Sequence, residues 1–274
     1  MHRGGMSTTS NTRPSGPPID ADLRTTEHTP TEVRSRSPWH RVTVAGLITL
    51  CATLTVIQVV NSTVIPAVVV FTVILGALAL ALGHRAGNRT LLAAAAASVV
   101  LVVANIPVAI GDLRHPESSA GFVPTATAIV AGLTVAVSGI LAATRRAPRA
   151  ATPTAIAAVI AVAVCATTSG IASLSTTDDQ RRAGDIVIDV RDVAYSDVTI
   201  PSGANVLFID NHDLIRHTLL IEETGTDVEI PGGTARRVRV ELAPGVYRYI
   251  CDVAGHDRMR GTITVTDDSV ETGP

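Results

Sequence analysis

The feature that most constrains this chain is a series of five long apolar stretches in its first two thirds. They are residues 42–60, 65–83, 90–110, 122–144 and 154–173. Each has about the 20 residues that a helix needs to cross a hydrocarbon layer of ~30 Å. None has Asp, Glu, Lys, Arg or His in its interior, and no amphipathic segments are present to cover them in water. The sequence therefore predicts an all-α transmembrane bundle of about five helices over residues 39–174.

The charges between these stretches predict the orientation of the bundle. Arg residues precede the first stretch and lie in the second and fourth loops, at Arg34, Arg36, Arg41, Arg85, Arg89, Arg145, Arg146 and Arg149. The turn 61–64 has no charge, and in the loop 111–121 one Arg is balanced by two acidic residues. This alternation is typical of a multi-pass protein of the cell membrane with a cytoplasmic N-terminus. Five crossings then make everything after residue 175 extracytoplasmic. If the 61–64 turn does not reach the membrane interface, the number of crossings changes and the C-terminal part is expected on the other side.

Polar segments flank the bundle. Residues 1–38 are rich in Ser, Thr, Pro and Arg and have almost no large apolar side chains. Such a segment cannot bury enough surface to offset its chain entropy, so we expect a disordered cytoplasmic tail. Residues 175–184 are predicted to be a linker, and residues 268–274 a second disordered tail.

The pattern changes to short alternating runs over residues 185–267. The expected strands are residues 186–188, 198–200, 206–209, 218–221, 236–242, 246–250 and 261–266, with turn residues between them. Seven or more short strands at this spacing favour an antiparallel β-sandwich. The whole chain has a net charge of only -2, which does not suggest a nucleic-acid partner.

Cysteine usage draws attention to one position in the sandwich. Cys51 and Cys165 lie within apolar stretches, where a thiol behaves as a small hydrophobic group. Cys251 is the single Cys of the predicted extracytoplasmic part, and a lone thiol in an oxidising compartment needs a reason. His256 and Met259 follow within nine residues, and His217 lies upstream. Two His, one Cys and a long axial Met make the blue-copper type of coordination.

These motifs resemble the cupredoxin family of blue copper proteins. The run Pro-Gly-x-Tyr-x-Tyr-x-Cys ends at Cys251, and His256, Met259 and a Gly-Thr-x-Thr-Val strand follow it. An Asn-x-Asp-x-x-x-His-Thr element upstream, beginning at Asn211, matches the family's other ligand loop. The resemblance implies a Greek-key β-sandwich with one type 1 copper and one-electron transfer. The implied ligands are His217, Cys251, His256 and Met259, with Met259 axial, and Asn211 would brace the site through backbone hydrogen bonds.

The alternatives for the site stay open at this point. A zinc ion accepts Cys and His ligands too. Cys251 could be a buried structural thiol, or His212 could replace His217 as a ligand. Only two residues separate His256 from Met259, and this short spacing puts the axial bond in question.

The sequence thus predicts a membrane-anchored electron carrier rather than an enzyme, with an unidentified redox or copper-delivery protein as its partner. One rival function is copper handling, meaning storage or delivery, and another is a purely structural module. No His or carboxylate lies within a predicted span. The bundle is therefore expected to anchor the protein in the lipid bilayer or to dock another membrane protein.

Overall fold

The computed structural model describes residues 37–61, 64–84 and 87–267 of this chain. The two predicted tails, 1–38 and 268–274, lie outside these residues except for positions 37 and 38. Three of the Arg residues that bear on the orientation, Arg34, Arg36 and Arg85, also lie outside them.

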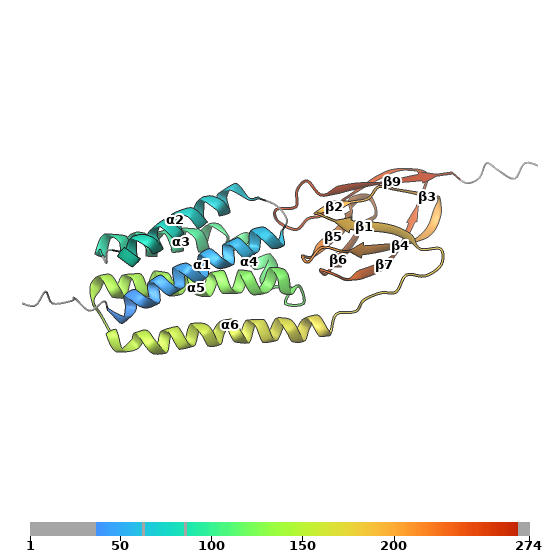
Figure 1. Ribbon diagram of the computed structural model, residues 1–274. Helices are drawn as coiled ribbons and strands as arrows, with labels where there is room; N and C mark the ends of the chain where they lie inside the picture. The colour runs from blue at the N-terminus through green and yellow to red at the C-terminus, as the bar shows by residue number, and fades with distance from the viewer. Residues whose placement is uncertain (1–36, 62–63, 85–86, 268–274) are drawn as a thin grey trace, which may run out of the picture. The chain divides into compact units, whose positions relative to one another are not determined.

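Across the ranges that the structure describes, six α-helices make up the N-terminal part (Figure 1). They are α1 Pro38–Val60, α2 Pro66–His84, α3 Asn88–Ala104, α4 Ile106–Leu113, α5 Ser119–Thr144 and α6 Ala151–Leu174, which a short 3-10 turn, Pro148–Ala150, precedes. Within the described residues, four helices are long and apolar enough to cross a membrane, namely α1, α2, α5 and α6. The pair α3 and α4 makes a fifth if it counts as one bent span. The prediction of a helical bundle with about five spans is therefore confirmed, since the structure has four to five candidate spans.

The third predicted stretch, 90–110, differs from a straight helix. It breaks at Asn105, where α3 and α4 meet at an angle of 62°. Pro107 has no N–H to donate back to the carbonyl of Val103, and its ring clashes with that turn, so the helix cannot continue straight through it. Asn105 caps the end of α3, since its side chain donates to the carbonyl of Leu101 at 2.8 Å and its backbone N–H donates to the same carbonyl at 3.3 Å.

Helix α1 packs against α2 and α5, and α5 also packs against α3 and α6. Trp39, at the start of α1, is buried, and its indole N–H donates to the carbonyls of Arg146 and Ala147 just after α5. Small residues allow close contact elsewhere, since a Cβ on Gly139 of α5 would lie 2.9 Å from the carbonyl oxygen of Leu91. Such glycine contacts are a common way for membrane helices to approach each other.

Over residues 186–266, nine strands form two sheets (Figure 1). They are β1 Ile186–Arg191, β2 Ala194–Tyr195, β3 Val198–Pro201, β4 Gly203–Asn211, β5 His217–Ile221, β6 Thr226–Ile230, β7 Ala235–Leu242, β8 Gly245–Ile250 and β9 Arg260–Thr266. One sheet has the order β2-β1-β4-β7, and the other has the order β3-β9-β8-β5-β6. The predicted β-sandwich is confirmed, and a core of apolar side chains lies between its sheets.

The expectation of a wholly antiparallel sandwich is wrong. Strand β1 pairs parallel with β4, and β3 pairs parallel with β9. The chain leaves the first sheet after β2 and enters the second sheet with β3. A chain that crosses between sheets does not pair through a hairpin, so its strand can join an edge in either direction. The sequence pattern also missed β2, which has only two residues, and β6, in which Val228 and Ile230 are the only apolar residues.

Tyr249 of β8 and Gly261 of β9 are direct partners across the second sheet. The fully buried ring of Tyr249 lies over the Gly261 backbone, and its hydroxyl donates to the carbonyl of Ser196. A Cβ at position 261 would overlap this ring. Because the hydroxyl is held at its far end, the ring has little freedom to move away.

Replacing Gly261 with Ala is therefore expected to lower the free energy of unfolding of the sandwich by about 1–3 kcal/mol through overpacking. All three Tyr of the chain lie in the sandwich, so urea unfolding of the full chain in detergent can be followed by near-ultraviolet tyrosine circular dichroism. An Ala204→Ser substitution at an exposed position of β4 is the control and should change stability by less than about 0.5 kcal/mol. Equal stability of the Gly261 variant and this control would contradict the steric argument.

Candidate metal centre

The pairing of β5 with β8 places the two ends of the candidate site opposite each other. In this antiparallel pair Leu220 faces Ile250, so His217 at the start of β5 lies near Cys251, which directly follows β8. The pairing continues in the side chains. The Thr218 hydroxyl donates to the Asp252 carboxylate at 2.6 Å and accepts the Asp252 backbone N–H at 2.9 Å. These bonds fix the segment that carries Cys251 against the strand that carries His217.

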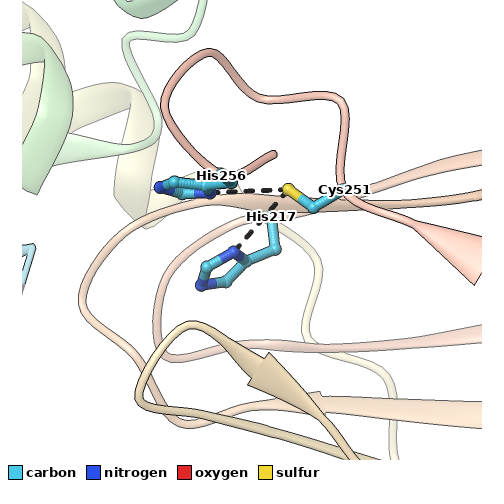
Figure 2. A group of neighbouring side chains, drawn as sticks. All are labelled: His217, Cys251 and His256. Carbon is cyan, nitrogen blue, oxygen red and sulfur yellow. Dashed lines mark hydrogen bonds between the residues drawn. The ribbon is translucent and has the colours of Figure 1, made fainter. Parts of the chain in front are cut away.

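Three donor atoms meet at this end of the sandwich (Figure 2). The sulfur of Cys251 lies 3.8 Å from Nδ1 of His217 and 3.5 Å from Nδ1 of His256. The two imidazole centroids are 4.9 Å apart. All three side chains are buried, and His217 is fully buried. The structure thus brings together three of the four predicted ligands from two separate segments of the chain.

These separations fit a shared metal ion. Ligands that lie about 2.0–2.3 Å from one ion and spread at roughly 110–120° are themselves roughly 3.5–3.8 Å apart. The distances from the Cys251 sulfur to the two His nitrogens, 3.8 Å and 3.5 Å, lie within this range. A thiolate with two imidazoles is also a donor set that copper accepts. The residues present therefore fit a copper ion.

Met259 completes the loop that carries His256. Its side chain is buried, and its backbone N–H donates to the carbonyl of His256 at 2.7 Å. The carbonyl of Met259 accepts the N–H of Cys251 at 3.1 Å, which closes the loop onto the end of β8. The short spacing between His256 and Met259 is thus accommodated by a tight turn. Ligation by Met259 remains a prediction.

Asn211 makes the backbone hydrogen bonds that the family resemblance implied. Its side-chain amide donates to the carbonyls of Ile215, Ile230 and Pro231, and its oxygen accepts the N–H of Asp213. These bonds tie the loop before His217 to the turn after β6. Gly232 in that turn is needed for the same contact, since a Cβ there would overlap the carbonyl of Leu214.

His212, the alternative ligand, points to another place. Its Nε2 lies 3.5 Å from a carboxylate oxygen of Asp189 and 3.4 Å from one of Asp210. Arg191 is 3.2 Å from the same nitrogen. The structure groups His212 with these acidic residues on the first sheet, whereas His217 is grouped with Cys251 and His256.

Sequence reasoning assigned no role to two residues that contact the side chains of the candidate ligands. The backbone N–H of Thr218 points to the Cys251 sulfur at 3.5 Å. The carboxylate of Asp213 is 2.9 Å from Nε2 of His217. Both residues belong to the Asn-x-Asp-x-x-x-His-Thr element of the sequence, but the sequence analysis gave neither of them a role, because the contacts of Asp213 depend on how its loop folds.

Burial also sets the protonation of the two imidazoles. Burial is the main cause that lowers the pKa of His256 to about 4, and the neighbouring His217 and Arg216 contribute to the same shift. Burial lowers the pKa of His217 as well, although the nearby Asp213 carboxylate acts in the opposite direction. Both rings are therefore neutral near pH 7, which leaves a lone pair on each for a metal.

Two sheets with a Cys and two His buried at one end make up a small β-sandwich with a candidate metal site. Residues 155–265 match the family model described as the cupredoxin-like domain. The match starts within α6, covers strands β1 to β8 and ends one residue before the end of β9. The C-terminal part of this chain therefore contains a cupredoxin-like domain.

Parts of this chain are also similar to parts of individual proteins. A segment of 75 residues is 37% identical to cytochrome c oxidase subunit 2 of Thermus thermophilus and covers 26% of this chain. It spans 55% of that relative, so about half of the relative's length is matched. A structure of reduced amicyanin has 19% identity and a TM-score of 0.27, covering 32% of this chain and 87% of that one. A heme-copper terminal oxidase dimer has 25% identity and a TM-score of 0.26, covering 30% and 64%.

The lowered pKa of the two imidazoles predicts how the metal-free protein responds to acid. The folded-state pKa of each lies below the ordinary value of 6.5, so the unfolded chain takes up protons at a higher pH than the folded chain. The stability that the neutral rings provide is fully present above about pH 6.5 and is lost as the pH falls, in the case of His256 down to its folded-state pKa of about 4. Urea unfolding of the metal-free full chain between pH 7 and pH 4.5 measures this loss.

Carboxylates also lose their interactions in acid, so the informative quantity is a difference between proteins. A His256→Gln variant lacks one of the two groups, and its free energy of unfolding should decline less steeply with falling pH than that of the natural chain. Equal slopes for the two proteins would show that His256 is not held in its neutral form by the fold.

Proposed function

We propose that this chain is a membrane-anchored, extracytoplasmic type 1 copper protein that carries single electrons. His217, Cys251 and His256 would hold one copper ion, with Met259 as the axial ligand. The protein would act as a carrier between redox partners rather than as a catalyst. The observation that supports this most directly is the meeting of one sulfur and two imidazole nitrogens within 4.8 Å of one another in a buried position.

The chain's own residues suit this role in three ways. The two neutral imidazoles and the thiol offer a mixed nitrogen and sulfur donor set, and copper bound there would supply a one-electron couple between its +1 and +2 states. Cys251 and Met259 belong to the apolar core of the sandwich, which excludes water from one side of the site. The β5–β8 pairing and the Asn211 bonds hold the donors in place without a metal, so little rearrangement is needed when charge changes.

Copper binding can be tested on the full chain in detergent with one equivalent of Cu(II). The expected result is an intense visible absorption from thiolate-to-copper charge transfer. Cys251→Ser should abolish this band because it removes the only thiol of the site. Cys165→Ser is the matched control, since it removes a thiol of α6, and the band should persist in it.

The outcome also separates the electron carrier from its rivals. Reversible reduction of the coloured protein at one fixed potential supports the carrier function. A chain that binds copper without this band, or that exchanges the metal quickly and is not reversibly reduced, would favour copper handling. A folded chain that binds no copper would leave protein contact as the better account.

Contacts within the helical part support the orientation that the Arg pattern predicts. Trp39 near the start of α1 bonds to the loop after α5, and the His40 imidazole lies 3.1 Å from the carbonyl of Leu82 near the end of α2. The ends that carry Arg41, Arg145 and Arg146 therefore lie on the same side of the bundle. Clustered Arg residues favour the cytoplasmic side. With α3 and α4 as one crossing, α6 then leads out of the cell to the sandwich.

Chemical labelling tests this orientation. In a chain whose three natural Cys are replaced by Ser, single Cys residues are placed at Asp227 in β6 and at Arg149 in the loop before α6, both exposed positions. A membrane-impermeant maleimide should label the Asp227→Cys protein in intact cells. It should label the Arg149→Cys protein only after the membrane is permeabilised, and the reverse pattern would overturn the proposed topology.

A further inference from the structure

The two nitrogens of the His217 ring face different neighbours. Its Nδ1 faces the Cys251 sulfur, and Figure 2 shows the other ring nitrogen pointing away from that sulfur. On that far side, Nε2 lies 2.9 Å from Oδ2 of Asp213. His217 is fully buried and the Asp213 side chain is 15% exposed, so water competes little for this contact.

The carboxylate of Asp213 is itself firmly held. Its Oδ1 accepts the backbone N–H of Asp192 at 2.8 Å, and its Oδ2 accepts that of Val193 at 2.9 Å. Both of these residues have positive φ, 53° and 58°, an uncommon backbone conformation for residues other than Gly. Two successive left-handed residues in the turn between β1 and β2 thus aim their N–H groups at one carboxylate. Such backbone arrangements favour a bound anion.

The backbone of Asp213 is fixed from two more directions. Its N–H donates to the side chain of Asn211 at 3.0 Å, and its carbonyl accepts the N–H of Gly233 at 2.9 Å. The position of this carboxylate is therefore determined by the β1–β2 turn, by Asn211 and by the turn after β6. It does not depend on the His217 ring to hold it in place.

We infer that Asp213 is a positioning residue that fixes the tautomer of His217 and strengthens its Nδ1 as a metal ligand. An ionised carboxylate can only accept hydrogen bonds, so the neutral ring must carry its hydrogen on Nε2. The lone pair is then on Nδ1, the nitrogen that faces Cys251. A carboxylate bonded to the far nitrogen of a ligating His raises the basicity of that ligand. The inference rests on the proposed copper function for its effect on a metal, but the tautomer is a property of the metal-free protein.

The consequence for copper has a definite sign. A more basic imidazole and a nearby negative charge stabilise the more positive Cu(II) state relative to Cu(I). Asp213 is thus expected to lower the reduction potential and to increase the affinity for Cu(II). An Asp213→Asn variant keeps the shape and an accepting oxygen but loses the charge, so its potential should rise. Its affinity for Cu(II) should fall about 10–100-fold, the usual effect of losing such a partner.

Two experiments test this inference. The first compares the reduction potential and the Cu(II) affinity of the full chain with those of the Asp213→Asn and Asp257→Asn variants. Asp257 is an exposed carboxylate next to His256, so its variant removes the same charge beside the other imidazole. A clearly larger rise in potential for Asp213→Asn, with the visible band retained, supports the inference. Equal shifts in the two variants, or no shift, would reduce Asp213 to a structural residue.

The second experiment needs no metal. Nitrogen NMR of the metal-free full chain, labelled with ¹⁵N-histidine and assigned by difference from a His217→Gln variant, reports which ring nitrogen carries the hydrogen. The expected result is the Nε2–H tautomer, replaced by a mixture in Asp213→Ala. An Nδ1–H tautomer in the natural chain overturns the inference even if the variants do not fold. Failure of the natural chain to show the copper band, with Nε2–H observed, overturns the proposed function while the positioning role stands.

Discussion

The register between β5 and β8 is the constraint on which the candidate site depends. One pair, Leu220 opposite Ile250, sets which residues at the strand ends meet. Successive side chains of a strand point to opposite faces, so a slip of one residue would turn His217 away from Cys251. The Thr218–Asp252 bonds lock the register from the side. The loop to Met259 then closes back onto Cys251 and brings His256 into the same space.

The sequence predicted the parts of this chain that rest on strong local patterns. Long uncharged stretches predicted the spans, and the spacing of Cys251, His256 and Met259 predicted the loop. What it could not predict depends on contacts between distant segments or on local breaks in a pattern. The bend at Asn105 arises where Pro107 interrupts an otherwise uniform apolar stretch. The parallel pairing of β1 with β4 depends on how the chain crosses between sheets, which strand periodicity does not encode.

Asp213 shows the same limit at the level of the site. Its contact with His217 spans four residues, but the groups that hold its carboxylate come from residues 192 and 193, about twenty positions upstream. Neither the amino-acid composition nor the spacing of apolar residues in the sequence indicates that this turn contacts the loop before His217. The similarity to cupredoxin-like domains explains why the donors could be named in advance. The surroundings that tune those donors are specific to how this chain folds.

The burial of Cys251 has a consequence for the time before any metal arrives. Disulfide exchange and oxidation both require that an oxidant or another thiol reach the sulfur. With only 4% of this residue exposed and backbone and hydroxyl groups of Thr218 against its sulfur, the folded domain shields its single thiol. In the proposed extracytoplasmic location, this shielding would keep the thiol reduced and available to a metal, because folding itself limits the access of oxidants to the sulfur.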